Sequence, residues 1–230
     1  PICEGSVICE LATTILPEDQ WIYDFSFPKD GGKPNPHVWT NPQMAGDFAA
    51  LIRDSLVAAD PDNAATYKSN YETFVLKIDA LDQAIVESTA TLAPDQRKLL
   101  TYHDAFAYFA RTYGWTVIGA IQPSSFEEPT PREIAELIDQ VKQEGVTAIF
   151  GSEVFPSSVL EQIGKESSVR YVDVLRDDDL LGAPGDPEHS WLGLMRFDYV
   201  TMVEALGGDA SALESLDVSD VGPDTANYPQ

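Results

Sequence analysis

The chain opens without a sustained hydrophobic period and then becomes strongly periodic. Residues 1–39 mix Pro, Gly and aromatic side chains, which predicts an irregular connecting segment. Apolar side chains then recur every three or four positions over 42–56 and again over 63–88. This spacing predicts two helices with buried apolar stripes, the second long enough to serve as a strut, in a helical region at 40–90. The stripes consist of Met44, Phe48, Leu51, Ile52 and Leu56, and of Tyr67, Tyr71, Phe74, Ile78, Leu81 and Ile85.

After residue 90 the period changes to short apolar runs that alternate with helical segments. This alternation predicts parallel strands joined by right-handed crossovers. We therefore expect an α/β fold, with a four-stranded parallel sheet flanked by helices in a lobe at 91–208. The expected strands are 99–102, 116–121, 147–151 and 170–175, and the expected helices between them are 104–114, 130–144 and 156–168.

A last helix is predicted within 189–206, where Trp191, Leu194, Met195 and Val203 occupy inward positions. Gly207 and Gly208 follow it as a stop signal. The remaining residues, 209–230, are polar and acidic and are expected to form a tail.

Charge narrows the choice of partners. The chain carries 38 acidic and 14 basic side chains, a net charge of -24, which repels nucleic acid. The same charge would favour cationic ligands, but a solvated surface or adaptation to salt is the better explanation for most of these carboxylates. No apolar run is long enough to cross a bilayer, and no export signal is visible.

Two cysteines occur, Cys3 and Cys9. Their spacing allows a small disulfide loop in an oxidising compartment, and two free thiols are the alternative. A zinc site made of cysteines alone would need more of them than this chain has.

Candidate chemistry gathers where the predicted strands end. His103 follows the run LLTY, and Asp177, Asp178 and Asp179 follow RYVDVL. Because parallel strands point the same way, these side chains are expected at one edge of the sheet, where ligands of open α/β sheets bind. Imidazole and carboxylate together suit zinc, or manganese when oxygen ligands predominate. Taken singly, the histidine also fits a hydrogen-bonding role and the aspartates a helix-capping loop.

The chain has two further histidines. His37 lies between two prolines in KPNPHVWTNP, directly before the first predicted helix, and alone it identifies no site. His189 begins the last predicted helix, where the helix dipole disfavours the charged ring. We expect it to be a surface or neutral capping residue.

Three motifs, in this order, resemble the zinc- and manganese-specific solute-binding proteins of bacterial ABC importers, a family that includes adhesins. The first is NPHVWTNPQMAGDFAALIRDSLVAADPDNAATYKSNYETF, the second LLTYHDAFAYFARTYGWTVIGAI, and the third LRDDDLLG followed by SWLGLMRFDY. The resemblance covers about residues 34–206. It implies a binding protein rather than an enzyme: two lobes around a stiff helix capture a divalent ion and deliver it to a membrane permease.

The resemblance also implies a ligand set. His37 and His103 match liganding positions, and Asp178 is the better-aligned carboxylate, with Asp177 next. Histidine at 103 is typical of the zinc-type members, so Zn²⁺ is expected and Mn²⁺ is the alternative. Glu153 matches an acidic position near the cleft that is not a usual ligand.

The family resemblance further implies a monomer outside the cytoplasm, in the periplasm or on the cell surface, with a lipid anchor on a preceding segment. Members carry an N-terminal α/β lobe with another liganding histidine, and residues 1–32 do not resemble it. We expect the chain to be a fragment, with a shortened variant as the alternative.

Two other classes of function remain open at this point. A zinc-dependent hydrolase would use His37, His103 and an aspartate as ligands and Glu153 as general base, although no HExxH motif is present. A structural or adhesive module would have no functional metal.

Overall fold

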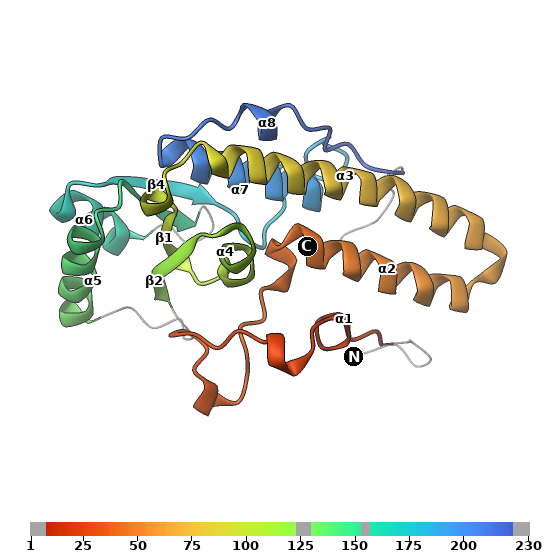
Figure 1. Ribbon diagram of the computed structural model, residues 1–230, viewed down its shortest axis with the longest axis horizontal. Coiled ribbons are helices and arrows are strands. Elements are labelled where there is room, and N and C mark those ends of the chain that lie inside the picture. Colours follow the sequence, from red (N-terminus) through yellow and green to blue (C-terminus); the bar gives the residue numbers. More distant parts are fainter. Residues whose placement is uncertain (1–7, 123–129, 153–156, 223–230) are drawn as a thin grey trace.

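A four-stranded, all-parallel sheet forms the centre of the computed structural model, which describes residues 8–122, 130–152 and 157–222 (Figure 1). The strands are β1 (Lys98–His103), β2 (Thr116–Gln122), β3 (Ala148–Ser152) and β4 (Arg170–Leu175), in the spatial order β2-β1-β3-β4. Each lies within about one residue of its expected position. The predicted α/β fold class is therefore confirmed.

Two hydrophobic cores lie on opposite faces of this sheet, because successive strand side chains point to opposite sides. Leu99 and Phe150 point to the core under α3 (Ala64–Ala90), α4 (Ala107–Tyr113) and α7 (Trp191–Ala205). Leu100 and Ile149, their neighbours in sequence, point to the core under α5 (Pro131–Glu144) and α6 (Ser158–Ser167). Helices α5 and α6 lie together at the left in Figure 1.

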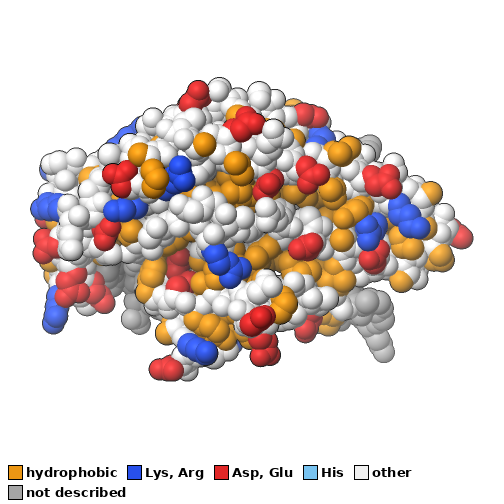
Figure 2. All heavy atoms as spheres, in the orientation of Figure 1, with side chains coloured by type: hydrophobic (Ala, Val, Ile, Leu, Met, Phe, Trp, Pro, Cys, Tyr) orange, Lys and Arg blue, Asp and Glu red, His pale blue; other side chains and the backbone are white. Residues whose placement is uncertain are grey.

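Helices α2 (Pro42–Ala59) and α3 form an antiparallel hairpin that extends beyond the sheet (Figure 1). The inner half of the α3 stripe is buried at Ile78, Leu81 and Ile85. The predicted burial is wrong at the outer end of α2, where Ile52 is 43% and Leu56 41% exposed. The outer turns pack mainly on each other and lie beyond the sheet, so hydrophobic side chains show at the surface along the hairpin (Figure 2).

The boundaries of the helices follow their capping residues. The Asn41 side chain accepts hydrogen bonds from the backbone N–H groups of Gln43 and Met44, and Pro42 is the first residue of α2. Thr130 and Glu133 form a capping box at the start of α5. Ser190 caps α7 by accepting from the N–H of Gly193. None of the helices in the described part of the chain has the length and apolar character of a membrane span.

The two ends of the described chain pack on this framework. The segment before α2 contains α1 (Leu11–Ile15), and its Leu16 and Val38 bury Tyr108 of α4. Within the expected acidic tail, residues 209–222 contain α8 (Ser211–Glu214), whose Leu213 is fully buried against α3 and α7. Short 3-10 helices complete the secondary structure: η1 (Glu18–Gln20), η2 (Lys29–Gly31), η3 (Val38–Thr40), η4 (Pro61–Asn63) and η5 (Pro94–Gln96).

Cys9 is exposed, with its Sγ 3.4 Å from the Oγ of Ser55. Cys3 lies outside the described residues, and so does the predicted pairing of the two cysteines.

Candidate metal centre

An imidazole and a carboxylate meet beyond the carboxyl ends of two strands. His103 is the last residue of β1, and Asp177 follows β4 by two residues. The Nδ1 atom of His103 lies 2.6 Å from the Oδ2 atom of Asp177. Asp178 completes a group in which one ligand atom of each side chain lies within 4.8 Å of the others. The sheet edge thus brings together the nitrogen and oxygen donors expected there.

The loop that carries Asp177 is held in place by a second carboxylate, the fully buried Asp198 of α7. The two side-chain oxygens of Asp198 accept hydrogen bonds from the backbone N–H groups of Arg176 and Asp177, each with an N–O distance of 3.0 Å. They hold Asp177 at a φ of 39°, in the left-handed region that non-glycine residues rarely adopt. Burial and then the charge of Asp177 raise the pKa of Asp198 to about 7, against the lowering effect of the two N–H groups. The loop is therefore built to present one particular carboxylate.

His37 reaches the same place from the segment before α2. Its ring centroid lies 4.4 Å from that of His103, with the rings nearly perpendicular. Trp39, two residues later, donates its indole N–H to the backbone oxygen of Asp177 at 3.1 Å. This hydrogen bond joins the His37 segment to the Asp177 loop across 138 residues of sequence.

The two imidazoles differ in their electrostatic surroundings. Burial, and then the charge of His103, lower the pKa of His37 to about 3, against the raising effect of a hydrogen bond with the Asp104 backbone. His37 is therefore neutral over the physiological range and offers a nitrogen lone pair. Burial also opposes the charged form of His103, but the hydrogen bond and charge of Asp177, with the charges of Asp178 and Asp104, raise its pKa overall. Below this raised pKa, His103 carries a proton with which a metal ion must compete.

Zinc affinity should consequently rise with pH. Below the raised pKa of His103, each ion must displace one proton, so affinity should fall about tenfold per pH unit. His37 should add nothing above pH 5, because its pKa is about 3. Calorimetry between pH 5.5 and 8, in buffers of different ionisation enthalpy, measures both the affinity and the protons released. A pH-independent affinity would contradict this assignment of the proton.

The stability of the metal-free protein should change with pH in the opposite direction, falling as the pH rises. The protonated His103 ring pairs with Asp177, so its folded-state pKa lies above the unfolded value of about 6.5. The resulting stability is fully present below that unfolded value and is lost as the pH rises through the folded-state pKa.

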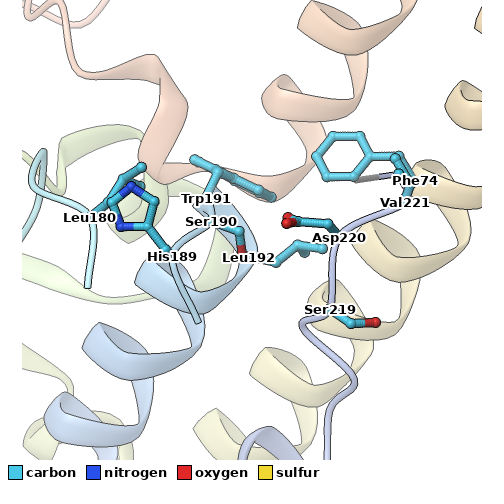
Figure 3. A pocket seen from close by; sticks show the side chains of 10 residues that line it. Phe74, Leu180, His189, Ser190, Trp191, Leu192, Ser219, Asp220 and Val221 are labelled. Carbon is cyan, nitrogen blue, oxygen red and sulfur yellow. The ribbon is translucent and has the colours of Figure 1, made fainter. Parts of the chain in front are cut away.

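The third histidine considered in the sequence lies away from this group. His189 lies before α7, where its Nδ1 atom is 2.8 Å from the backbone oxygen of Leu181. It lines a separate cavity of about 350 Å³ with Phe74, Trp191 and Asp220 (Figure 3). Glu153, expected near the cleft, lies outside the described residues.

Comparison with known proteins agrees with this architecture. The model of a family described as "zinc-uptake complex component A, periplasmic" matches residues 4–205. The iron-binding protein YfeA of Yersinia pestis is 29% identical over 176 residues, covering 76% of this chain and 56% of the relative. The manganese-binding lipoprotein MntA of Halalkalibacterium halodurans is 27% identical, covering 75% of this chain and 57% of the relative. The chain thus spans a little over half the length of these curated relatives.

Solved structures extend the likeness to the fold. The periplasmic zinc-binding protein TroA of Treponema pallidum superposes with a TM-score of 0.76 at 24% identity, over 88% of this chain and 73% of that one. A manganese-bound point mutant of a periplasmic metal-binding protein from Candidatus Liberibacter asiaticus gives a TM-score of 0.68 at 27% identity, over 75% of this chain and 64% of that one.

Proposed function

The chain belongs to the family of periplasmic zinc-uptake component A proteins, and from this premise we propose that it captures one divalent transition-metal ion through His37, His103 and Asp177. In this proposal the protein then delivers the ion to the membrane permease of an ABC importer. The observation that carries the proposal is the convergence of His103 and Asp177, 2.6 Å apart, beside the ring of His37. The three come from separate segments of the chain.

Asp177 is the preferred carboxylate in this proposal, and Asp178 is the second candidate. The side chain of Asp177 is only 7% exposed and its carboxylate points at His103. Asp178 is exposed, so water competes for its oxygens. The sequence comparison prefers Asp178, but the Asp198 hydrogen bonds favour its neighbour.

Zinc is the proposed ion because two imidazole nitrogens, that of His103 after it has lost its proton to the ion, favour a borderline metal over manganese, which prefers oxygen ligands. Relatives of this chain are named for iron and manganese, and a structural relative for zinc. The family description supports capture outside the cytoplasm, and the net charge of -24 disfavours a nucleic-acid partner. A monomer is part of the proposal.

The functions for which the relatives are named favour metal binding over hydrolysis as the function of this chain. The family and the relatives named above are metal-binding or metal-uptake proteins rather than enzymes. The hydrolase alternative relies on Glu153 as general base, and this residue lies outside the described part of the chain.

Replacing the two aspartates separately tests the proposal. We expect one zinc ion per wild-type chain and a loss above about 100-fold in affinity for Asp177→Ala, because removing a ligand exceeds the roughly 10–100-fold cost of removing a ligand's hydrogen-bonding partner. Asp178→Ala should lose far less. Asp179→Ala is a matched control, since Asp179 is exposed and pairs with Arg176.

Competition calorimetry with a zinc chelator gives the affinities. Added zinc should also raise the melting temperature, and more so for the variants that bind it more tightly. A wild-type chain that binds no zinc would refute the proposed function. Equal losses for Asp177→Ala and Asp178→Ala would refute only the choice of carboxylate.

A further inference from the structure

The buried side chain of Asn35 connects His37 to the irregular segment that precedes it. The Oδ1 atom of Asn35 lies 2.8 Å from the Nδ1 atom of His37 and 3.0 Å from its backbone nitrogen. The Nδ2 atom of Asn35 donates to the Oδ2 atom of Asp24 at 3.0 Å and to the backbone oxygen of Asp104 at 3.1 Å. Both polar atoms of the amide are therefore used.

The orientation of this amide is fixed by partners that have only one hydrogen-bonding role. The backbone N–H of His37 can only donate, so the atom facing it must be the amide oxygen. The backbone oxygen of Asp104 can only accept, so the atom facing it must be the amide NH₂. Asp24 adds a second acceptor, and its other oxygen is held by the N–H groups of Ser26 and Phe27. A flipped amide would place its NH₂ group against the backbone N–H of His37 and its oxygen against the backbone oxygen of Asp104.

The fixed amide determines which nitrogen of His37 carries the proton. An amide oxygen only accepts, so the Nδ1 atom of His37 must be the donor. A neutral imidazole has one N–H, so its Nε2 atom is left with the lone pair. The ring is also held by edge contacts with Phe27 and Trp39, at centroid distances of 5.8 and 5.1 Å.

We propose that Asn35 is a positioning residue that locks His37 in the Nδ1–H tautomer and so presents Nε2 as its metal-binding atom, with Asp24 and the Asp104 carbonyl holding Asn35. The inference rests on the proposed function for its purpose, because it assumes that His37 is a ligand. A ring free to place its proton on Nε2 would have to move that proton before binding. The segment around Asp24 thus fixes the protonation of the His37 ring, in addition to leading into the site.

Metal-free protein labelled with ¹⁵N-histidine tests the tautomer directly. Long-range ¹H–¹⁵N correlation spectra near pH 7.5 should show His37 with a protonated Nδ1 and an unprotonated Nε2. In Asn35→Ala the same ring should lose this single tautomer, and zinc affinity should fall by about 10–100-fold, the usual cost of losing the partner of a liganding histidine.

A matched control lies in the same segment. Asp30→Ala removes one exposed negative charge from η2 and leaves Asn35 and its partners in place, so both the tautomer and the affinity should stay as in wild type. A purely structural role for Asn35 would lower the melting temperature without changing the tautomer.

The inference is overturned if wild-type His37 carries its proton on Nε2, or if folded Asn35→Ala keeps both the tautomer and wild-type zinc affinity. The first of these readings needs no variant, so it stands even if Asn35→Ala does not fold. Failure of the proposed function would appear separately, as a wild-type chain that has the Nδ1–H tautomer but does not bind zinc.

Discussion

Zinc affinity should fall by more than about 100-fold when His103 is replaced with alanine, because a lost ligand costs more than the roughly 10–100-fold of a lost ligand partner. The change also leaves Asp177 without the ring that lies 2.6 Å from it. His37→Ala should cause a loss of similar size, since in the proposed site His37 supplies a neutral nitrogen ligand. Competition calorimetry at a pH near 7.5 measures both.

His189→Ala is the matched control for these two variants. It removes the chain's remaining imidazole, which hydrogen-bonds Leu181 before α7 and lines a separate cavity (Figure 3). Its zinc affinity should equal that of the wild type. If all three alanine variants bound zinc alike, the assignment of the site to His37 and His103 would be wrong.

Phe109→Ala should lower the free energy of unfolding by about 3–5 kcal/mol, the usual cost of emptying a buried phenylalanine site. Phe109 is 1% exposed and stacks on Tyr199 with a centroid distance of 4.7 Å. It also contacts Tyr113 and Trp115. The cavity would open between α4 and α7, where the rings have little room to close over it.

Urea denaturation followed by tryptophan fluorescence measures this loss, and Phe25→Ala is the control. Phe25 is 50% exposed, so its replacement should change the free energy of unfolding by less than about 0.5 kcal/mol. Equal destabilisation by the two variants would contradict the placement of the core.

Much of the fold could be predicted because the strands and helices carry clear local periods. Leu99 and Leu100, adjacent in sequence, could be assigned to a strand covered on both faces, and the structure buries both completely. The direction of parallel strands then placed His103 and Asp177 at one edge before any contact was known. The position of His37 beside them had no such local signal and came from the family motif.

The residues that support the site could not be found from the pattern because their roles are defined by distant partners. The local sequence of Asn35 indicates a proline turn, yet its side chain donates a hydrogen bond to the backbone oxygen of Asp104, 69 residues away. Asp198 was the better clue: a lone carboxylate within the apolar run GLMRFDYVTM must find donors if it faces the core. Its donors are backbone groups of the Asp177 loop, which no periodicity reveals.

Exposure was mispredicted for a related reason. A helical stripe says which residues share a face but not how far the neighbouring layer extends. Ile52 and Leu56 share the stripe of α2 and remain partly exposed where the hairpin passes beyond the sheet. Conversely, Leu213 lies in an acidic stretch and is fully buried, because α3 and α7 offer it a surface.

A crystal structure of the zinc-loaded protein, with anomalous data collected at the zinc absorption edge, tests the central claim most directly. The account predicts one anomalous peak about 2.0–2.1 Å from Nε2 of His37 and from a ring nitrogen of His103, and about 2.0–2.2 Å from an Asp177 oxygen. A fully occupied zinc ion elsewhere, with these three side chains left bonded only to protein, would contradict it.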